Sequence, residues 1–367
     1  MSVRQLSVAP TLPASAWTWP RAATPAFPLG DDTCRLFSQS RQGLWQALSR
    51  LRPEDGDELL VPAYHHGSEI ETVKAVGFLP RFYGGGDTLE PKEDELNALA
   101  GPATRGLYLI HPLGFAHDSP RWRAWCDQRA IALVEDGAQA WLSRREGVPV
   151  GTAADISIFC IYKTVGVPDG GVVRTSPAVG SVRPAPGAPG FEPLPVLRAH
   201  RRYLEQRIGR LARSRQPGPG DYQEDPDRDF APTPHLFHAS WASRYLACRV
   251  AGDETAARRR RNFCFLENRL GDHRSGAFGP LHEGASPLAF PVESDDKRGM
   301  LDHLARRGIT GGAAWTVRHP LLPAAGFPLA ANLRNRLVGL PVHQELREPD
   351  LEQIAEAARE WYAASGR

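Results

Sequence analysis

The chain has 367 residues, of which 41% are hydrophobic and 23% are charged, and its formal net charge is +2. This length predicts one large domain together with a smaller one. The small net charge gives no general electrostatic reason to expect nucleic acid as a partner, and we see no apolar run long enough to span a membrane. The first residues lack a basic segment followed by an apolar one, so no signal peptide is expected.

Cysteine usage indicates the compartment. The five cysteines are widely spaced, odd in number and without a metal-like pair: Cys34, Cys126, Cys160, Cys248 and Cys264. Free thiols in a reducing environment are the simplest interpretation. The sequence therefore predicts a cytoplasmic protein without a metal site.

Alternating helices and strands dominate the first two thirds of the chain. The stretch before about residue 37 is rich in Pro, Trp and Ala, and we expect residues 1–36 to form an extended arm rather than part of a core. Helices are then predicted over Gly43–Leu51, Glu69–Val76, Lys92–Ala100 and Pro120–Arg129. Strands are predicted over Glu58–Val61, Leu79–Tyr83, Gly106–Ile110, Ile131–Glu135 and from Ile156. This alternation is typical of an α/β domain with a mainly parallel sheet, which we assign to residues 37–240.

The last third has a different pattern. Pro177–Pro195 and Gln216–Pro234 are rich in Pro and Gly and predict two long surface connections, and such loops often cover a site. A helix-like stretch then runs from about Trp241 towards Leu270. Further on we predict a strand over Pro287–Val292, a helix over Lys297–Arg307, a strand over Leu337–Pro341 and a helix over Asp350–Ala364. Residues 241–367 therefore form a smaller α+β domain.

Three loops follow predicted strands: Pro62–Ser68, His111–Gly114 and Asp136–Gln139. Because ligands of parallel sheets bind at the carboxyl ends of the strands, we expect these loops to converge on one cleft. Two basic clusters lie elsewhere, at Arg198–Arg202 and Arg258–Arg261. They are either solvated helix faces or a site that recognises a phosphorylated substrate.

A lysine and an aspartate carry the strongest chemical signal. Lys163 follows the strand-like run from Ile156 and precedes Gly170-Gly171, and Asp136 ends a neighbouring strand. A lysine after a strand can form a Schiff base with an aldehyde cofactor. An aspartate nearby can keep a pyridine nitrogen protonated, which the electron sink of pyridoxal 5′-phosphate (PLP) requires. The pair predicts a PLP enzyme.

With these residues the chain resembles the DegT/StrS-type sugar aminotransferases, a family of fold-type I PLP-dependent enzymes, as a divergent member. The resemblance runs from about Phe37 to Glu360. It is carried by five pieces in the family's order: Gly56–Tyr64, Ile110–Gly114, Val134–Ala140, Lys163 with Gly170-Gly171, and Leu340–Gln344 followed by Asp350-Leu351.

The resemblance implies roles for matching residues. Lys163 is the Schiff-base lysine, and Asp136 is the acid that pairs with the pyridine nitrogen. Gln139 lies near the cofactor hydroxyl, and His66 stacks on the pyridine ring. Ser40 and Arg41 occupy the turn before a helix where the family usually has Gly-Thr for the cofactor phosphate, a position suited to an anion.

Two departures from the family pattern concern the phosphate and the substrate. Cys160 stands three residues before the lysine, where a serine often contacts the phosphate; a thiol is the poorer donor, and Ser157 or Arg41 is expected to compensate. The Asn-Tyr-Arg-like motif that reaches across the dimer is missing; the region around Trp241–Arg244 stands in its place.

Several functions remain open from the sequence. The leading one is transfer of an amino group from an amino-acid donor such as glutamate to a keto-sugar or related natural-product ketone, through a Lys163 internal aldimine. A PLP enzyme without net transamination, catalysing elimination, epimerisation or cyclisation, would use the same lysine and aspartate. A cofactor-binding protein with a regulatory or structural role is the third. The resemblance also implies a homodimer, with small-molecule substrates and with neither nucleic acid nor membrane as a partner.

Overall fold

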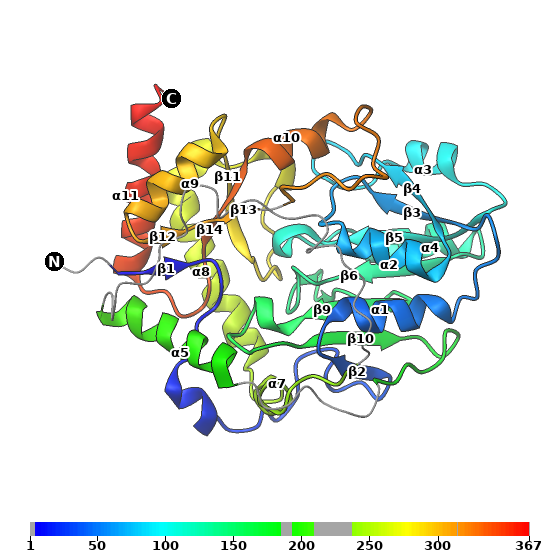
Figure 1. Ribbon diagram of the computed structural model, residues 1–367, viewed down its shortest axis with the longest axis horizontal. Coiled ribbons are helices and arrows are strands. Elements are labelled where there is room, and N and C mark those ends of the chain that lie inside the picture. Colours follow the sequence, from blue (N-terminus) through cyan, green and yellow to red (C-terminus); the bar gives the residue numbers. More distant parts are fainter. Residues whose placement is uncertain (1–3, 185–192, 209–236, 314, 367) are drawn as a thin grey trace.

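The structure is a computed structural model that describes residues 4–184, 193–208, 237–313 and 315–366. Figure 1 shows a larger part around a central sheet and a smaller part that carries the C-terminal helix. In the described ranges, no helix is both long and apolar enough to cross a membrane.

A seven-stranded sheet organises the larger part, in the order β2-β10-β9-β6-β5-β3-β4. The parallel strands are β3 (Glu58–Pro62), β4 (Leu79–Tyr83), β5 (Thr104–Ile110), β6 (Ala132–Asp136) and β9 (Ile156–Cys160). β10 (Gly171–Thr175) runs antiparallel to β9 and to the edge strand β2 (Cys34–Phe37). The predicted α/β class with a mainly parallel sheet is confirmed.

The helices of this part lie close to their predicted positions. They are α1 (Ser40–Ser49), α2 (Ser68–Val76), α3 (Glu93–Leu99) and α4 (Ser119–Asp127). α2 ends at Gly77, whose left-handed φ of 110° suits a residue without a Cβ. A short hairpin, β7 (Arg144–Arg145) and β8 (Val148–Pro149), follows β6. Strand–helix alternation therefore predicted the layers correctly.

Both faces of the sheet are buried, and the side-chain alternation of each strand divides its residues between two cores. On β5, Tyr108 and Ile110 belong to the larger apolar cluster, which also contains side chains of α1 and α2. Leu107 and Leu109, on the other face, pack in a cluster with Trp122 of α4. Continuous apolar strands of this kind are expected where helices cover both faces of a parallel sheet.

The smaller part is built on an antiparallel sheet in the order β11-β14-β13. Its strands are β11 (Ala289–Glu293), β13 (Gly312–Ala313) and β14 (Leu337–Pro341), and its helices are α8 (Gly252–Leu270), α9 (Lys297–Arg306), α10 (Pro328–Arg336) and α11 (Glu348–Ala364). The predicted strands at β11 and β14 and the helices at α9 and α11 are confirmed. We did not predict α10, which begins at a proline, a residue that fits the first helical turn.

The N-terminal stretch differs from the expected arm. Strand β1 (Leu6–Ser7) pairs in parallel with β12 (Ile309–Thr310), and Cys34–Phe37 forms β2 of the main sheet. Leu12 and Ala16 are fully buried. The expectation of an extended arm outside the core is therefore wrong, because apolar side chains between the prolines fill space against the rest of the chain. The domain limits 1–36, 37–240 and 241–367 stay a prediction.

The two predicted long connections lie partly or wholly outside the described residues. Gln216–Pro234 is outside them, and so is 185–192 within Pro177–Pro195. Helix α5 (Pro193–Ile208) carries the first basic cluster, and α7 (Trp241–Ala247) precedes α8. In α8 the second cluster is divided: Arg258 and Arg261 are exposed, whereas Arg259 is buried. The interpretation of Arg258–Arg261 as a uniformly solvated helix face is therefore wrong, because the Arg259 side chain points into the interior.

Candidate active site

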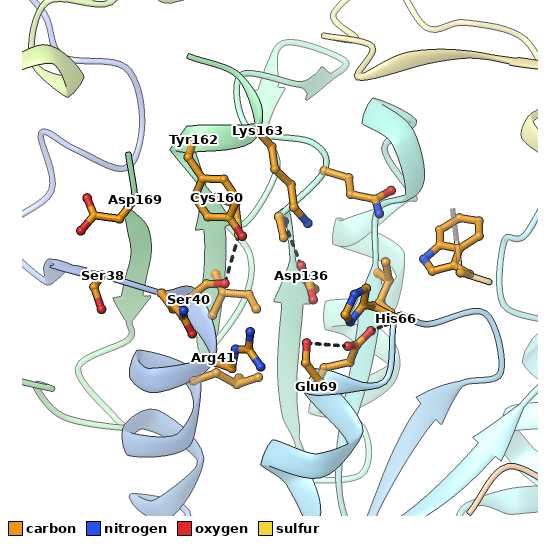
Figure 2. A pocket seen from close by; sticks show the side chains of 18 of the residues that line it. Ser38, Ser40, Arg41, His66, Glu69, Asp136, Cys160, Tyr162, Lys163 and Asp169 are labelled. Atoms are coloured by element: carbon orange, nitrogen blue, oxygen red, sulfur yellow. Dashed lines mark hydrogen bonds between the residues drawn. The ribbon is translucent and has the colours of Figure 1, made fainter. Parts of the chain in front are cut away.

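A cavity of about 420 Å³ opens where β6 and β9 end and α1 begins. Figure 2 shows Lys163 and Asp136 pointing into it, with His66 and Glu69 on one side and Ser40 and Arg41 on another. The cavity is lined by Ser38, Gln39, Ser40, Arg41, Leu44, His66, Ser68, Glu69, Ile110, Asp136, Ala138, Gln139, Ile158, Cys160, Tyr162, Lys163, Pro168, Asp169 and Trp315. Seven of the eight predicted site residues are among them. Of the three loops expected to converge, Pro62–Ser68 and Asp136–Gln139 contribute to the lining, whereas His111–Gly114 contributes no residue.

Lys163 is the last residue of a 3-10 turn, Ile161–Lys163, that directly follows β9. Gly170 and Gly171 then bring the chain back beside the start of α1. A Cβ added to Gly171 would lie 1.9 Å from the Ser40 backbone nitrogen, so this close approach requires glycine. The glycine pair therefore fixes the lysine turn next to the helix N-terminus.

Asp136 is the last residue of β6 and is held by two donors. The Tyr108 phenol donates to its Oδ2 at 2.8 Å, and the Ala138 backbone N–H donates to its Oδ1 at 2.8 Å. Burial raises the pKa of Asp136 to about 6, and the nearby negative charge of Glu69 adds to that effect. This buried carboxyl group therefore lacks a compensating positive partner of sufficient strength, and a cation bound in the cavity would supply one.

Gln139 and His66 line the same cavity. The Gln139 side chain is anchored because its Oε1 accepts a 2.9 Å hydrogen bond from the Leu113 backbone N–H. The His66 backbone N–H donates to Glu69 Oε1 at 2.8 Å, and Figure 2 shows the imidazole at the cavity edge beyond Asp136. Both residues therefore line the cavity, and the stacking of His66 on the pyridine ring and the contact of Gln139 with the cofactor hydroxyl stay predictions.

Ser40 and Arg41 form the first turn of α1, whose N-cap is Gln39. The helix therefore begins three residues before the predicted start at Gly43, so Ser40 and Arg41 lie in its first turn rather than before it. No acidic residue occupies this first turn, so the positive end of the helix dipole and Arg41 together form a site suited to an anion. Ser40 Oγ lies 3.1 Å from Cys160 Sγ, which places the predicted thiol at this end of the cavity.

Ser157 is the exception among the predicted residues. It lies on the other face of β9 from Ile158 and Cys160, and its hydroxyl donates to the Gly151 carbonyl at 2.6 Å. The expectation that Ser157 contacts a cofactor is therefore wrong, because the two-residue alternation of a strand directs it away from the cavity.

Among the cavity residues that were not predicted as site residues are Glu69, Asp169 and Tyr162. Glu69 accepts hydrogen bonds from the His66 and Gly67 N–H groups at 2.8 and 3.0 Å, at the start of α2. Asp169 accepts hydrogen bonds from Ser240 and Ser243, which ties the start of α7 to the segment just before Gly170-Gly171. The neighbouring Cys160 thiol, together with burial, raises the pKa of the Tyr162 phenol well above its usual range. Glu69 directly follows the loop Pro62–Ser68, which the sequence had assigned to the cleft, and this neighbourhood could have identified Glu69 as a cavity residue.

A buried pair supports the loops behind the cavity. His111 Nε2 lies 3.0 Å from Glu135 Oε2, and both side chains are fully buried. The same carboxylate oxygen accepts from Ser119 Oγ and the Gly151 N–H, each at 2.8 Å. Glu135 precedes Asp136, so it projects from the opposite face of β6. The Ile110–Gly114 motif is therefore explained partly by structural support rather than by contact with a ligand.

Known proteins are similar to part or all of this chain. The sequence model of the DegT/DnrJ/EryC1/StrS aminotransferase family matches residues 29–178, which include Arg41, Asp136 and Lys163. This part of the chain is similar to that family. A GDP-perosamine synthase of Vibrio cholerae is 30% identical over 139 residues, which cover 37% of this chain and 38% of that protein.

Longer but weaker similarity covers the rest of the chain. A dTDP-3-amino-3,4,6-trideoxy-alpha-D-glucose transaminase of Streptomyces venezuelae is 24% identical over 343 residues, covering 86% of this chain and 79% of that one. The crystal structure of the aminotransferase TlmJ from Streptoalloteichus hindustanus matches with a TM-score of 0.68 at 19% identity over the full length of both chains. At that identity the likeness establishes the fold.

PLP is the cofactor of this family, and the cavity fits it. The acid with the raised pKa, Asp136, would face the pyridine nitrogen, and Gln139 lies on the same strand-end turn. The N-terminus of α1 with Ser40 and Arg41 would receive the phosphate, and Lys163 Nζ would meet the aldehyde. In the described ranges no group of His, Cys, Asp or Glu is arranged to hold a metal ion.

Proposed function

We propose that the protein is a PLP-dependent aminotransferase that moves an amino group from an amino-acid donor, glutamate being the first to test, to a keto-sugar or a related cyclic ketone. The observation that carries this proposal is the convergence of Lys163, Asp136 and Gln139 on one cavity at the ends of parallel strands. The names of the family and of the relatives, which include sugar transaminases, support the substrate class.

Each residue has a defined task in this proposal. When bound, the cofactor supplies an aldehyde that condenses with amines and a ring that withdraws electrons. Lys163 would hold the cofactor covalently in the resting enzyme, and once an amino donor has taken its place, its Nζ would take and return the proton of the reacting carbon. Asp136 keeps a proton on the ring nitrogen, and Tyr108 and the Ala138 N–H hold its carboxylate in place.

Apolar side chains of the cavity would limit the contact between the cofactor and bulk water. Ile110 and Ile158 form apolar walls beside the buried Asp136. A water-poor environment strengthens the attraction between the carboxylate and a positively charged ring. Trp315 and Asp169 also line the cavity and have no task toward the cofactor in this proposal, so they are available to contact the acceptor.

A half-reaction tests the proposal. The purified protein, saturated with PLP, is mixed with glutamate without any acceptor, and the visible absorbance is followed. Conversion to the pyridoxamine form with stoichiometric release of 2-oxoglutarate is expected. If glutamate, glutamine, aspartate and alanine all leave the band unchanged, while an amino acid is instead eliminated or epimerised, the protein is a PLP enzyme without net transamination.

A further inference from the structure

A buried arginine lies directly behind the lysine turn. Arg259 belongs to α8 of the smaller part, is 1% exposed, and points away from its exposed neighbours Arg258 and Arg261. Its Nη2 donates to the Thr164 carbonyl at 3.0 Å, and Thr164 is the residue after Lys163. The arginine thus contacts the backbone at the point where the chain leaves the lysine.

The same guanidinium group gathers two other segments. Its Nε donates to Gln344 Oε1 at 2.9 Å, and its Nη1 donates to the Pro287 carbonyl at 3.2 Å. Gln344 Nε2 in turn donates to the Thr164 carbonyl at 3.1 Å. The Thr164 carbonyl therefore receives two donors, and both come from the smaller part of the molecule.

If only folding stability mattered, burying the Arg259 guanidinium group among these acceptors would be unfavourable. All three acceptors are neutral, and no carboxylate within the described ranges pairs with Arg259. Burial accordingly lowers the pKa of its guanidinium to about 9. A buried charge without an opposite charge contributes less to stability than an apolar side chain of similar volume. A planar fork with several donors, however, fixes several carbonyl groups at once, which an apolar side chain cannot do.

We propose that Arg259 is a positioning residue, which together with Gln344 holds the Thr164 carbonyl and so fixes the orientation of the turn that presents Lys163 to the cavity. This inference rests on the proposed function, in which Lys163 bonds the cofactor. It also gives Gln344, in the Leu340–Gln344 motif, a physical role: it links the smaller part to the reacting lysine.

Substitutions in the PLP-loaded protein test the proposal. Arg259→Met keeps an unbranched stem but removes every donor, and Arg259→Lys keeps the charge but cannot reach three separate acceptors. Arg261→Met, two residues along the same helix and exposed, is the matched control. Three quantities are measured: the melting temperature, kcat and KM for the amino donor, and the visible circular dichroism per bound cofactor, which reports the fixed orientation of the cofactor.

We expect Arg259→Met to fold and to bind cofactor. Its kcat should fall on the order of 10- to 100-fold, because a misplacement of about 1 Å near the reacting atoms has effects of that size. KM for the donor should change less than kcat, the visible circular dichroism per cofactor should weaken, and Arg259→Lys should fall between Arg259→Met and the parent. Arg261→Met should match the parent in all three quantities.

Parent-like kcat and circular dichroism in Arg259→Met would overturn the positioning role. If Arg259→Met does not fold, Arg259→Lys carries the test, and parental values in that variant overturn the role equally. A parent protein that bonds no cofactor at Lys163 is a different result, because it contradicts the proposed function itself.

Discussion

The Tyr108 phenol donates a 2.8 Å hydrogen bond to the Asp136 carboxylate from the neighbouring strand β5. The two side chains face the same side of the sheet, since each strand alternates its residues between the two faces. This bond orients the acid and partly stabilises its negative form. Burial and Glu69 nevertheless dominate, and the carboxyl keeps a raised pKa of about 6.

The pH dependence of stability should reveal that raised pKa in the cofactor-free protein. Between the usual pKa of 3.8 and about 6, the native state binds a proton more strongly than the unfolded state does. The contribution of Asp136 to stability is therefore fully present below that window and is lost as the pH rises through it. The loss should be on the order of 2–3 kcal/mol, at about 1.4 kcal/mol per pKa unit.

Urea unfolding of cofactor-free parent and Asp136→Asn at pH 5 and pH 7.5 measures the part of this contribution that is lost above pH 5, about 1.4 kcal/mol for the one pKa unit between pH 5 and about 6. On raising the pH, the parent should lose stability relative to the variant, whose amide does not titrate. Equal pH dependence in the two proteins would mean that the Asp136 pKa is not raised.

Asp136→Asn should also slow the reaction. A neutral amide cannot hold a proton on the ring nitrogen, so the electron sink is lost. We expect the rate of the glutamate half-reaction to fall by about two to four powers of ten, or roughly 3–5 kcal/mol of barrier, while cofactor binding falls less. Stopped-flow absorbance checks this, and near-normal turnover would place the required acid elsewhere.

Arg41 should hold the cofactor phosphate. Arg41→Ala should weaken PLP retention by about 1.5–3 kcal/mol, the usual value for a hydrogen bond to a charged group. Arg41→Lys should recover part of that, since a point charge lacks the planar fork. Equilibrium dialysis measures both. If Arg41→Ala retains PLP as the parent does but loses activity with the acceptor, Arg41 contacts the substrate instead.

The active protein should be a homodimer. Fold-type I resemblance implies sites formed at a two-fold interface, and two-fold dimers are the commonest oligomers. Light scattering of the active protein at micromolar concentration should give about twice the chain mass of 40.3 kDa. An active species of single-chain mass would contradict this.

The sequence predicted the sheet and the main site because each depends on local pattern. The apolar run Ile156–Cys160 predicts a strand from local sequence alone. Lys163 lies three residues after this strand in the sequence, so its place near the strand end does not depend on distant segments. The prediction that Ser157 contacts the cofactor was wrong, because the alternation of side chains along the strand, rather than proximity to Lys163 in the sequence, decides which side chains reach the cavity.

The features that the sequence did not predict depend on contacts between residues far apart in the chain. The burial of Leu12 in the N-terminal stretch depends on surfaces formed much later in the chain. Arg259 lies in a run of four arginines, and nothing local distinguishes the buried one from its exposed neighbours. Its partners Thr164 and Gln344 are 95 and 85 residues away in the sequence, so the positioning role of Arg259 could be inferred only from the structure.

The most direct test of the account is the site of covalent cofactor attachment. The PLP-loaded protein is reduced with borohydride and digested, and the labelled peptide is mapped by mass spectrometry. We predict one label, on Lys163, and its loss together with the visible band in Lys163→Ala. A label on Lys74, Lys92 or Lys297 in place of Lys163 would contradict the assignment of the active site.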